Sequence, residues 1–269
     1  MKKHVLDLKV LDNTKLNHNH NVLELGCEMP LPPMVPGQFA EVRVDQSPGT
    51  FLRRPFSIHR VDKGANTMHL LVKTVGEGTR HISALTKGSM LNVMFPLGNG
   101  FTVTQNKEVL LVGGGCGVAP LYFLADQLFR KGNKVSILIG GRSAADVLLA
   151  DEYRSFGNVY IATEDGTLGE KGMVTTHSVL RQKELPFSMI YCCGPDGMMR
   201  AVAHIAENKS IACEVSLENT MACGIGACLC CVVETQQGNQ CVCTEGPVFN
   251  TTKLKGWTAE TEVGCSLDN

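Results

Sequence analysis

Six of the twelve cysteines lie within 21 residues near the end of the chain. Four of them, with the spacing C-x4-C-x2-C and a distant fourth cysteine, are Cys223, Cys228, Cys231 and Cys243. This is the ligand spacing of plant-type [2Fe–2S] clusters. Glycines at 224 and 226 would let backbone N–H groups approach the cluster sulfides, where a side chain would clash. The spacing therefore predicts a carrier of single electrons.

Two cysteines inside this segment leave alternatives open. Cys230 does not have the gap that the pattern requires, and Cys241 is an alternative to Cys243 as the fourth ligand, although we favour Cys243. Otherwise we expect Cys230 and Cys241 to be buried thiols without a ligand role, like Cys213 and Cys265. A structural zinc site is the competing interpretation, but zinc sites of this kind usually pair two C-x2-C units.

A second group of residues could hold a flavin. Arg54-Pro55-Phe56-Ser57 stands at an expected strand, and the planar guanidinium of Arg54 suits a diphosphate because it donates paired, charge-assisted hydrogen bonds. Phe56 offers an aromatic surface for stacking. The hydroxyl of Ser57 can hydrogen-bond a flavin ring nitrogen, so we predict that Ser57 adjusts the flavin during catalysis. The alternative is an ordinary basic strand end.

Gly76-Glu77-Gly78-Thr79 precedes a short helix that we expect over 79–85. With Thr79 as N-cap, free backbone N–H groups at the positive end of the helix would suit a phosphate. The alternative is a plain glycine turn before a capped helix. The two motifs follow one another in a β-rich region, and each therefore supports the other.

A glycine-rich turn, residues 113–120, joins the apolar run Val109–Val112 to an expected helix. Its sequence GGGCGVAP departs from G-x-G-x-x-G, yet a strand–glycine–helix turn suits a pyrophosphate at a helix N-terminus. The candidate contacts are Gly113, Gly114, Gly115 and Gly117. Cys193 ends a later strand, where ligands lie in open α/β sheets, so we predict that it lines a nicotinamide site. Tight packing without a ligand is the alternative for both features.

The elements around these motifs predict a multidomain α+β protein. Residues 1–103 alternate apolar and polar residues between turns, which predicts an antiparallel β-barrel or sandwich. Residues 104–212 alternate apolar strands with helical stretches at 121–130 and 144–156, which predicts a doubly wound α/β domain. Residues 213–269 have few apolar residues for a core of their own, so a bound cluster would supply cross-links.

Composition excludes several classes of function. A formal net charge of −1 gives no electrostatic support for nucleic-acid binding. Charged residues interrupt the start of the chain, which does not resemble a signal peptide, and glycines and Pro120 break the longest uncharged run. We expect a cytoplasmic protein that does not enter a membrane.

Together these motifs resemble the ferredoxin–NADP reductase superfamily over residues 1 to about 200. The resemblance implies an FAD-binding β-barrel at residues 1–103 and an NAD-binding α/β domain at residues 104–212. In that superfamily the first motif is Arg-x-Tyr-Ser, and Phe56 here replaces the tyrosine. The tail Met221-Ala-Cys-Gly-Ile-Gly-Ala-Cys-Leu-Cys-Cys-Val232, followed by Cys243-Thr-Glu-Gly-Pro-Val-Phe249, closely resembles the electron-transfer subunits of B-type dihydroorotate dehydrogenases. In that family the position of Cys230 is usually occupied by a small residue, and the position of Glu245 is usually an aspartate.

The resemblance implies a partner subunit that carries FMN and oxidises dihydroorotate to orotate in pyrimidine biosynthesis. It implies NAD⁺ as the final acceptor and a heterotetramer with two copies of each subunit. By residue match it places Arg54–Ser57, Gly78 and Thr79 on FAD, together with Leu71, Val72 and Lys73. Because nicotinamide exchanges electron pairs and a [2Fe–2S] cluster takes one electron, FAD must lie between them. The expected path is dihydroorotate, FMN, cluster, FAD, NAD⁺.

Two rival functions remain. A related subunit of an NADPH-linked, ferredoxin-dependent oxidoreductase is similar, but its cluster loop has an acidic first ligand where Cys223 stands here. A non-catalytic binding protein with a zinc-stabilised tail would use the glycine turns for structure alone. The choice between NAD and NADP also stays open, because Arg142 follows a strand where the adenosine ribose would lie. We favour a solvated loop arginine over a contact to a 2′-phosphate.

Overall fold

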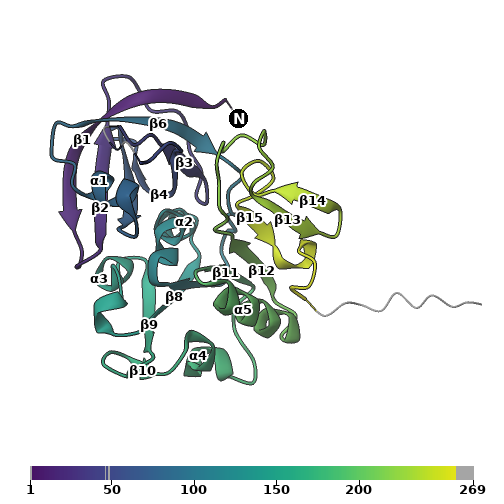
Figure 1. Cartoon of the computed structure of the whole chain (residues 1–269). Helices are drawn as coiled ribbons and strands as arrows, with labels where there is room; N and C mark the ends of the chain where they lie inside the picture. Colours follow the sequence, from purple (N-terminus) through teal and green to yellow (C-terminus); the bar gives the residue numbers. More distant parts are fainter. Residues whose placement is uncertain (1, 46, 48, 259–269) are drawn as a thin grey trace, which may run out of the picture.

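The computed structural model describes residues 2–45, 47 and 49–258. Figure 1 shows a β-barrel in purple and blue, an α/β domain in teal and green, and a C-terminal segment in yellow beside both. The fold class predicted from the sequence is confirmed. Cys265 lies outside the described residues, so its predicted role as a buried thiol is not addressed.

The first domain is a closed antiparallel barrel with the strand order β1-β2-β5-β4-β3-β6. Along β1 the side chains alternate, so that Leu8 and Val10 are fully buried while Asp7 and Lys9 face outward. This two-residue period is what the sequence predicted. The strands are β1 (His4–Lys15), β2 (His20–Gly26), β3 (Phe39–Val42), β4 (Arg54–Asp62), β5 (Thr67–Lys73) and β6 (Met90–Leu97).

A short helix, α1 (Glu77–Ser83), follows the barrel strand β5. It begins two residues earlier than expected, with Gly76 as its N-cap, so Thr79 lies in the first turn rather than capping it. The hydroxyl of Thr79 accepts hydrogen bonds from the N–H groups of Val75 and Gly76 at 2.9 and 3.0 Å. These bonds are the reason for the shift, because they hold the chain before the helix in place.

The second domain is a seven-stranded sheet with the order β10-β9-β8-β7-β11-β12-β15. Its central strands are parallel and apolar along their length, as expected for a sheet covered on both faces. The strands are β7 (Glu108–Gly114), β8 (Lys134–Gly141), β9 (Gly157–Thr163), β10 (Glu170–Lys171), β11 (Met189–Cys193), β12 (Ala212–Ser216) and β15 (Val248–Asn250).

The longer helices of this domain are α2 (Ala119–Arg130) and α5 (Asp196–Asn208), with a short α4 (Ser178–Arg181). The helix expected over 144–156 is interrupted. A 3₁₀ turn covers Ala144–Asp146, and α3 spans Ala150–Tyr153. The break has a local cause, because Leu149 adopts a left-handed conformation at φ 58°, which cannot continue a right-handed helix.

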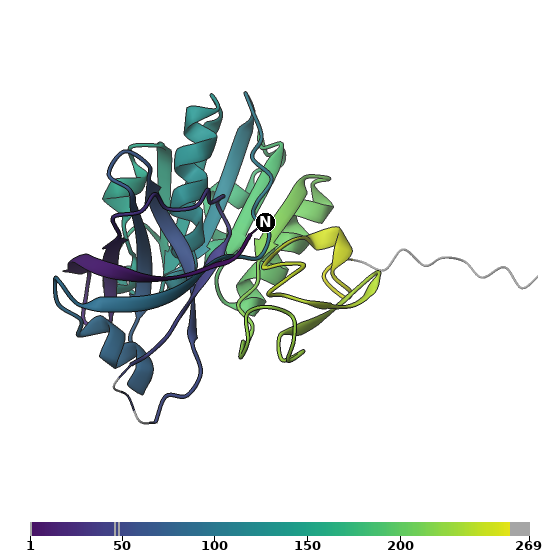
Figure 2. The same ribbon diagram turned by 90° about the horizontal axis from the view of Figure 1, so that it is seen from above.

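The C-terminal segment is not independent of the sheet. The hairpin of β13 (Val232–Thr235) and β14 (Gly238–Cys241) stands apart, but β15 pairs antiparallel with β12 and extends the seven-stranded sheet. The strand β12 itself runs past the expected boundary at 212. Seen from above in Figure 2, the segment packs against the α/β domain and the edge of the barrel. The buried side chains of the cluster region therefore pack in a core shared with both neighbouring domains.

Buried contacts also join the barrel to the α/β domain. His59 on β4 is fully enclosed, and its Nδ1 lies 3.0 Å from the carbonyl oxygen of Ala119 at the start of α2. Burial lowers the pKa of His59 to about 4, so this imidazole is neutral near pH 7. None of the helices in the described ranges has the length and hydrophobicity needed to traverse a bilayer.

Candidate cofactor sites

The loop that carries the first three predicted cluster ligands wraps around sulfur atoms. The N–H of Ala227 donates to Sγ of Cys223 at 3.3 Å, and the N–H of Gly226 donates to Sγ of Cys243 at 3.1 Å. The N–H of Cys243 donates to Sγ of Cys231 at 3.4 Å. Backbone donors thus bring Cys223, Cys231 and Cys243 around one loop, although they are up to twenty positions apart in the sequence.

The two glycines of this loop are needed for its backbone. Gly224 and Gly226 have φ values of 67° and 81°, in the left-handed region that disfavours side chains. A Cβ at Gly226 would also lie 2.9 Å from Cγ2 of Thr244. The prediction that glycine permits close approach of the backbone is consistent with this geometry.

Local hydrogen bonds favour the thiolate form of Cys223. Burial acts to raise the pKa of Cys223, but the N–H groups of Ile225, Cys228 and Ala227 outweigh it and lower the pKa to about 6. Iron–sulfur clusters are held by thiolates, so donors of this kind fit the group. Within the described ranges, no group of three or more His, Cys, Asp or Glu side chains is close enough together to hold one metal ion.

The loop is buried on one side and open on the other. Cys231 and Cys243 are 2% and 1% exposed and belong to the apolar core shared with the α/β domain. Cys228 is exposed, and so are the neighbouring side chains of Ile225 and Leu229. A cluster held here would have one protein-facing side and one side near the surface.

The other cysteines differ from expectation in part. Cys241 and Cys213 are buried as predicted, and Cys241 interacts with Cys231. Cys230 is exposed rather than buried, because it lies at the turn before β13, and its Sγ lies 3.5 Å from the carbonyl oxygen of Thr220. The contact from Gly226 to Cys243 supports Cys243 as the fourth ligand.

The predicted diphosphate residues come together at one end of the barrel. A Cβ placed on Gly78 would lie 3.3 Å from Nε of Arg54 and 3.0 Å from Cγ2 of Thr50. Arg54 on β4 and the first turn of α1 are therefore neighbours, although 24 positions separate Arg54 from Gly78. A guanidinium beside a glycine backbone fits a diphosphate, which needs donors and close approach.

The remaining flavin candidates point in different directions. Phe56 is 9% exposed and packs in the barrel core, so little of its ring is open to a flavin in this structure. Ser57 pairs with Phe39 of β3 and is half-buried. Leu71 packs in the core of the α/β domain, Val72 lies inside the barrel, and Lys73 is exposed at the end of β5.

A cleft of about 1000 Å³ lies between the barrel and the carboxyl ends of the parallel strands. Three of the predicted glycines, Gly114, Gly115 and Gly117, line it, and Lys73 reaches it from the barrel. Gly113 does not line the cleft, because it packs under Val118 and Leu121. The cleft lies at the carboxyl end of the sheet and is lined by glycine backbone, and both features fit a dinucleotide.

Sequence reasoning missed two residues at this cleft. The predicted residue Cys193 does not line the cleft, because it is fully buried behind it on β11, where burial raises the pKa of its thiol well above the usual range. The thiol that lines the cleft is Cys116, and Glu218 lines it from the segment after β12. Cys116 was visible inside the glycine turn, but nothing in the sequence indicated that Glu218 returns to this place.

Gly117 allows a specific stability prediction. A Cβ on Gly117 would lie far inside van der Waals contact with the backbone of Cys193, which cannot move without disturbing β11. We expect Gly117→Ala to lower the free energy of unfolding by about 3 kcal/mol. Gly197→Ala is the matched control, because a Cβ there meets no atom within 4 Å. Chemical denaturation of both variants tests this, and equal stability would contradict it.

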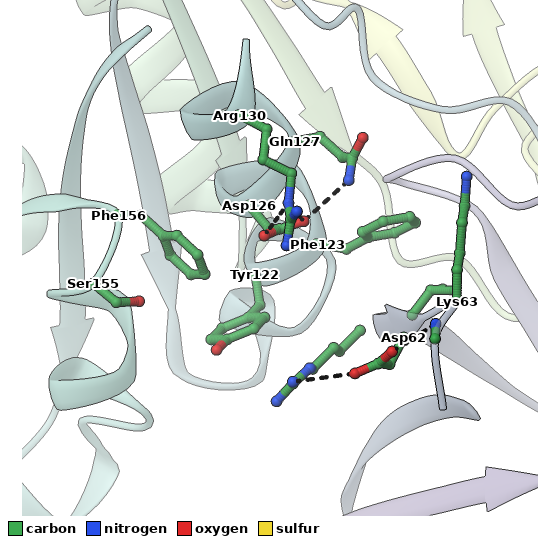
Figure 3. Close-up of a pocket in the computed structure, with 12 residues that line it drawn as sticks. Asp62, Lys63, Tyr122, Phe123, Asp126, Gln127, Arg130, Ser155 and Phe156 are labelled. Atoms are coloured by element: carbon green, nitrogen blue, oxygen red, sulfur yellow. Dashed lines mark hydrogen bonds and ion pairs between the residues drawn. The ribbon is translucent and has the colours of Figure 1, made fainter. Parts of the chain in front are cut away.

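A second cavity of about 520 Å³ lies between the β4–β5 hairpin and α2 (Figure 3). Tyr122, Phe123 and Phe156 form its apolar wall. Asp126 accepts hydrogen bonds from Arg130 at 2.8 Å and from Gln127 at 3.0 Å. The predicted cofactor residues do not line this cavity, and its acidic groups are already paired.

Three domain families match successive parts of the chain. Residues 7–101 match an oxidoreductase FAD-binding domain and residues 111–204 an oxidoreductase NAD-binding domain. Residues 218–255 match the iron–sulfur cluster binding domain of dihydroorotate dehydrogenase B. These ranges coincide with the barrel, the α/β domain and the cysteine loop described above.

Curated relatives agree over nearly the whole chain. The electron transfer subunit of dihydroorotate dehydrogenase B (NAD⁺) from Shouchella clausii is 38% identical over 93% of this chain and 97% of its own length. The subunits of the same name from Fusobacterium nucleatum and Bacillus velezensis are 40% and 42% identical, each over 80% of this chain and 84% of their own length.

Solved structures show the same architecture. An NADH-dependent reduced ferredoxin–NADP oxidoreductase aligns with a TM-score of 0.82 at 26% identity, over 92% of this chain and 89% of its own. The ferredoxin reductase of a carbazole 1,9a-dioxygenase shares the fold, with a TM-score of 0.67 over 78% of this chain and 67% of its own. Sequence identity is higher to the dihydroorotate dehydrogenase subunits. The chain belongs to the family of electron transfer subunits of NAD⁺-dependent dihydroorotate dehydrogenase B.

Proposed function

We propose that this chain carries electrons from the FMN of a dihydroorotate dehydrogenase catalytic subunit, through a [2Fe–2S] cluster and FAD, to NAD⁺. The observation that carries the proposal is the contact between the cysteine loop and the flavin barrel. Gly224, next to Cys223, packs directly on β3, which pairs with the strand of the Arg54–Ser57 motif. This contact supports placing the two cofactors next to each other.

The division of work among the residues follows from their chemistry. FAD, when bound, exchanges electron pairs with nicotinamide and single electrons with the cluster. Arg54 and the backbone at Gly78 and Thr79 would bind its diphosphate, and Ser57 would adjust its ring. The cleft glycines would bind NAD, and Cys193 would support the nicotinamide site from behind Cys116. The protein positions its cofactors and does no acid–base chemistry of its own.

Charges in the cleft support NAD over NADP. Arg142 is solvated, with 82% of its side chain exposed, and its Nε lies 3.9 Å from Oδ2 of Asp146. The lining includes the cations Lys73 and Arg142 but four acids, which are Asp146, Glu164, Asp196 and Glu218. An additional 2′-phosphate would meet this surplus of negative charge, whereas a ribose hydroxyl would not.

The open side of the cluster loop supports docking of the catalytic subunit there. Ile225 and Leu229 are 45% and 65% exposed beside Cys228, and apolar side chains exposed together mark interaction surfaces. We propose the heterotetramer with two copies of each subunit. We also propose the cytoplasm as its location, because six cysteines within 21 residues suit a redox centre, and a reducing compartment keeps such thiols available as ligands.

Reconstitution with an FMN-containing catalytic subunit tests the function. We expect anaerobically purified chain to contain iron and FAD, and the complex to reduce NAD⁺ when dihydroorotate is added. The catalytic subunit alone and the complex with NADP⁺ are the controls. Reduction of ferredoxin instead of NAD⁺ would favour the related ferredoxin-linked oxidoreductase, and a colourless zinc protein would contradict the proposal altogether.

A further inference from the structure

Glu41 is a carboxyl buried without a hydrogen-bond partner. It lies on β3 with no solvent exposure, and within the described ranges neither Oε1 nor Oε2 has a partner. Arg53 donates to the main-chain carbonyl of Glu41 at 3.1 Å, not to its carboxyl. Burial raises the pKa of Glu41 to about 7, against the lowering effect of Arg53. An apolar residue of this size would be cheaper to bury.

The side chain of Glu41 lies on the face of the barrel that the cluster loop covers. Glu41 pairs with Pro55 of β4, and Ser57 lies two residues along that strand, so the three side chains share one face of the sheet. A Cβ on Gly224 would lie 2.8 Å from Cγ and 3.1 Å from Oε1 of Glu41. Glu41 therefore meets the loop that holds Cys223 on the same face of the sheet that carries Ser57.

A second buried carboxyl, that of Glu214, is hydrogen-bonded and provides a comparison. Glu214 on β12 is 8% exposed, and both of its oxygens are satisfied by Thr102, which donates from N–H at 2.9 Å and from Oγ1 at 2.6 Å. Such pairing offsets the cost of burial. The carboxyl of Glu41 is buried without such hydrogen bonds, so its desolvation is not offset. Residues of this kind gather at functional sites.

We propose that Glu41 is a positioning residue that lowers the reduction potential of the cluster, by placing a carboxylate at the junction of the flavin barrel and the cluster loop. An electron added to the cluster increases its negative charge, and a nearby buried carboxylate opposes that addition. No bond is formed or broken in this step. The inference rests on the proposed function, because it requires both cofactors to be bound where their motifs lie.

Redox titration of the cluster in the purified holo-chain tests the inference, at a pH well above the pKa of Glu41. We expect Glu41→Gln and Glu41→Leu each to favour uptake of one electron about tenfold, a rise of about 59 mV in midpoint potential. Glu214→Gln, the matched control, is expected to leave the potential unchanged. Glu41→Leu is also expected to raise the thermal unfolding temperature of the chain without cofactors, because it removes an unpartnered carboxyl.

The outcomes separate the two claims. If the unaltered chain holds neither iron nor flavin, the proposed function fails before Glu41 is considered. If it holds both, and the Gln and Leu variants keep its iron, its flavin and its midpoint potential, Glu41 has no tuning role and the inference is overturned. A lower unfolding temperature for Glu41→Leu with an unchanged potential would assign Glu41 to packing and would also overturn it.

Discussion

Replacing Cys243 by alanine is expected to remove the iron and the red-brown absorption of the cluster, with FAD retained. The physical reason is that Sγ of Cys243 receives the N–H of Gly226 from the same loop that holds Cys223, so its loss opens one side of the site. A [2Fe–2S] cluster is held by four protein ligands, and alanine supplies no ligand atom in place of the Cys243 thiolate. Iron analysis and the visible spectrum of anaerobically purified protein measure the effect.

Two neighbouring cysteines provide the controls. Cys230→Ala is expected to leave iron content unchanged, because Cys230 is exposed and its Sγ lies next to the carbonyl of Thr220. Cys241→Ala distinguishes the two candidates for the fourth ligand, since Cys241 also lies near Cys231. Full loss of iron in Cys241→Ala, with retention in Cys243→Ala, would show that the assignment of the fourth ligand is wrong.

Local patterns were sufficient to predict most of the secondary structure. The alternation in β1 and the continuous apolar runs of β7 and β8 indicate their own strand type, because each reflects burial on one face or on two. The prediction of one helix over 144–156 was wrong, because nothing in the sequence around Leu149 indicates its left-handed conformation. The pairing of β15 with β12 could not be predicted either, because a strand of three residues is too short to show an alternation of apolar and polar residues.

The candidate sites divide in the same way. The cysteine spacing identified residues that the fold brings to one loop, because ligands of a cluster must be close in space and three of them are close in sequence. Glu218 and Glu41 had no such signal. Glu218 enters the nucleotide cleft after β12, and Glu41 meets the cluster loop across 183 positions of sequence. Their roles depend on how separate domains pack, which no local pattern contains.

Replacing Arg54 by alanine is expected to weaken FAD binding by about ten- to a hundredfold. Charge-assisted hydrogen bonds contribute roughly 1.5–3 kcal/mol each, and Arg54 lies beside Gly78, where a diphosphate would meet both. The guanidinium also donates to the carbonyls of Leu52 and Arg53, so it is held in place before any ligand binds. Titration of the flavin-free chain with FAD, followed by flavin fluorescence, gives the dissociation constant.

Arg60→Ala is the matched control for this change. Arg60 is on the same strand, its side chain is about half exposed, and its guanidinium lies 3.8 Å from Asp62, away from Gly78. Because the two variants lose the same charge from β4, a general electrostatic effect would weaken FAD binding in both. Loss of affinity in Arg54→Ala alone would locate the diphosphate at the end of β4 beside α1. Equal affinity in the unaltered chain and in both variants would mean that the phosphates are bound elsewhere, and Ser57 would then lose its place beside the flavin ring.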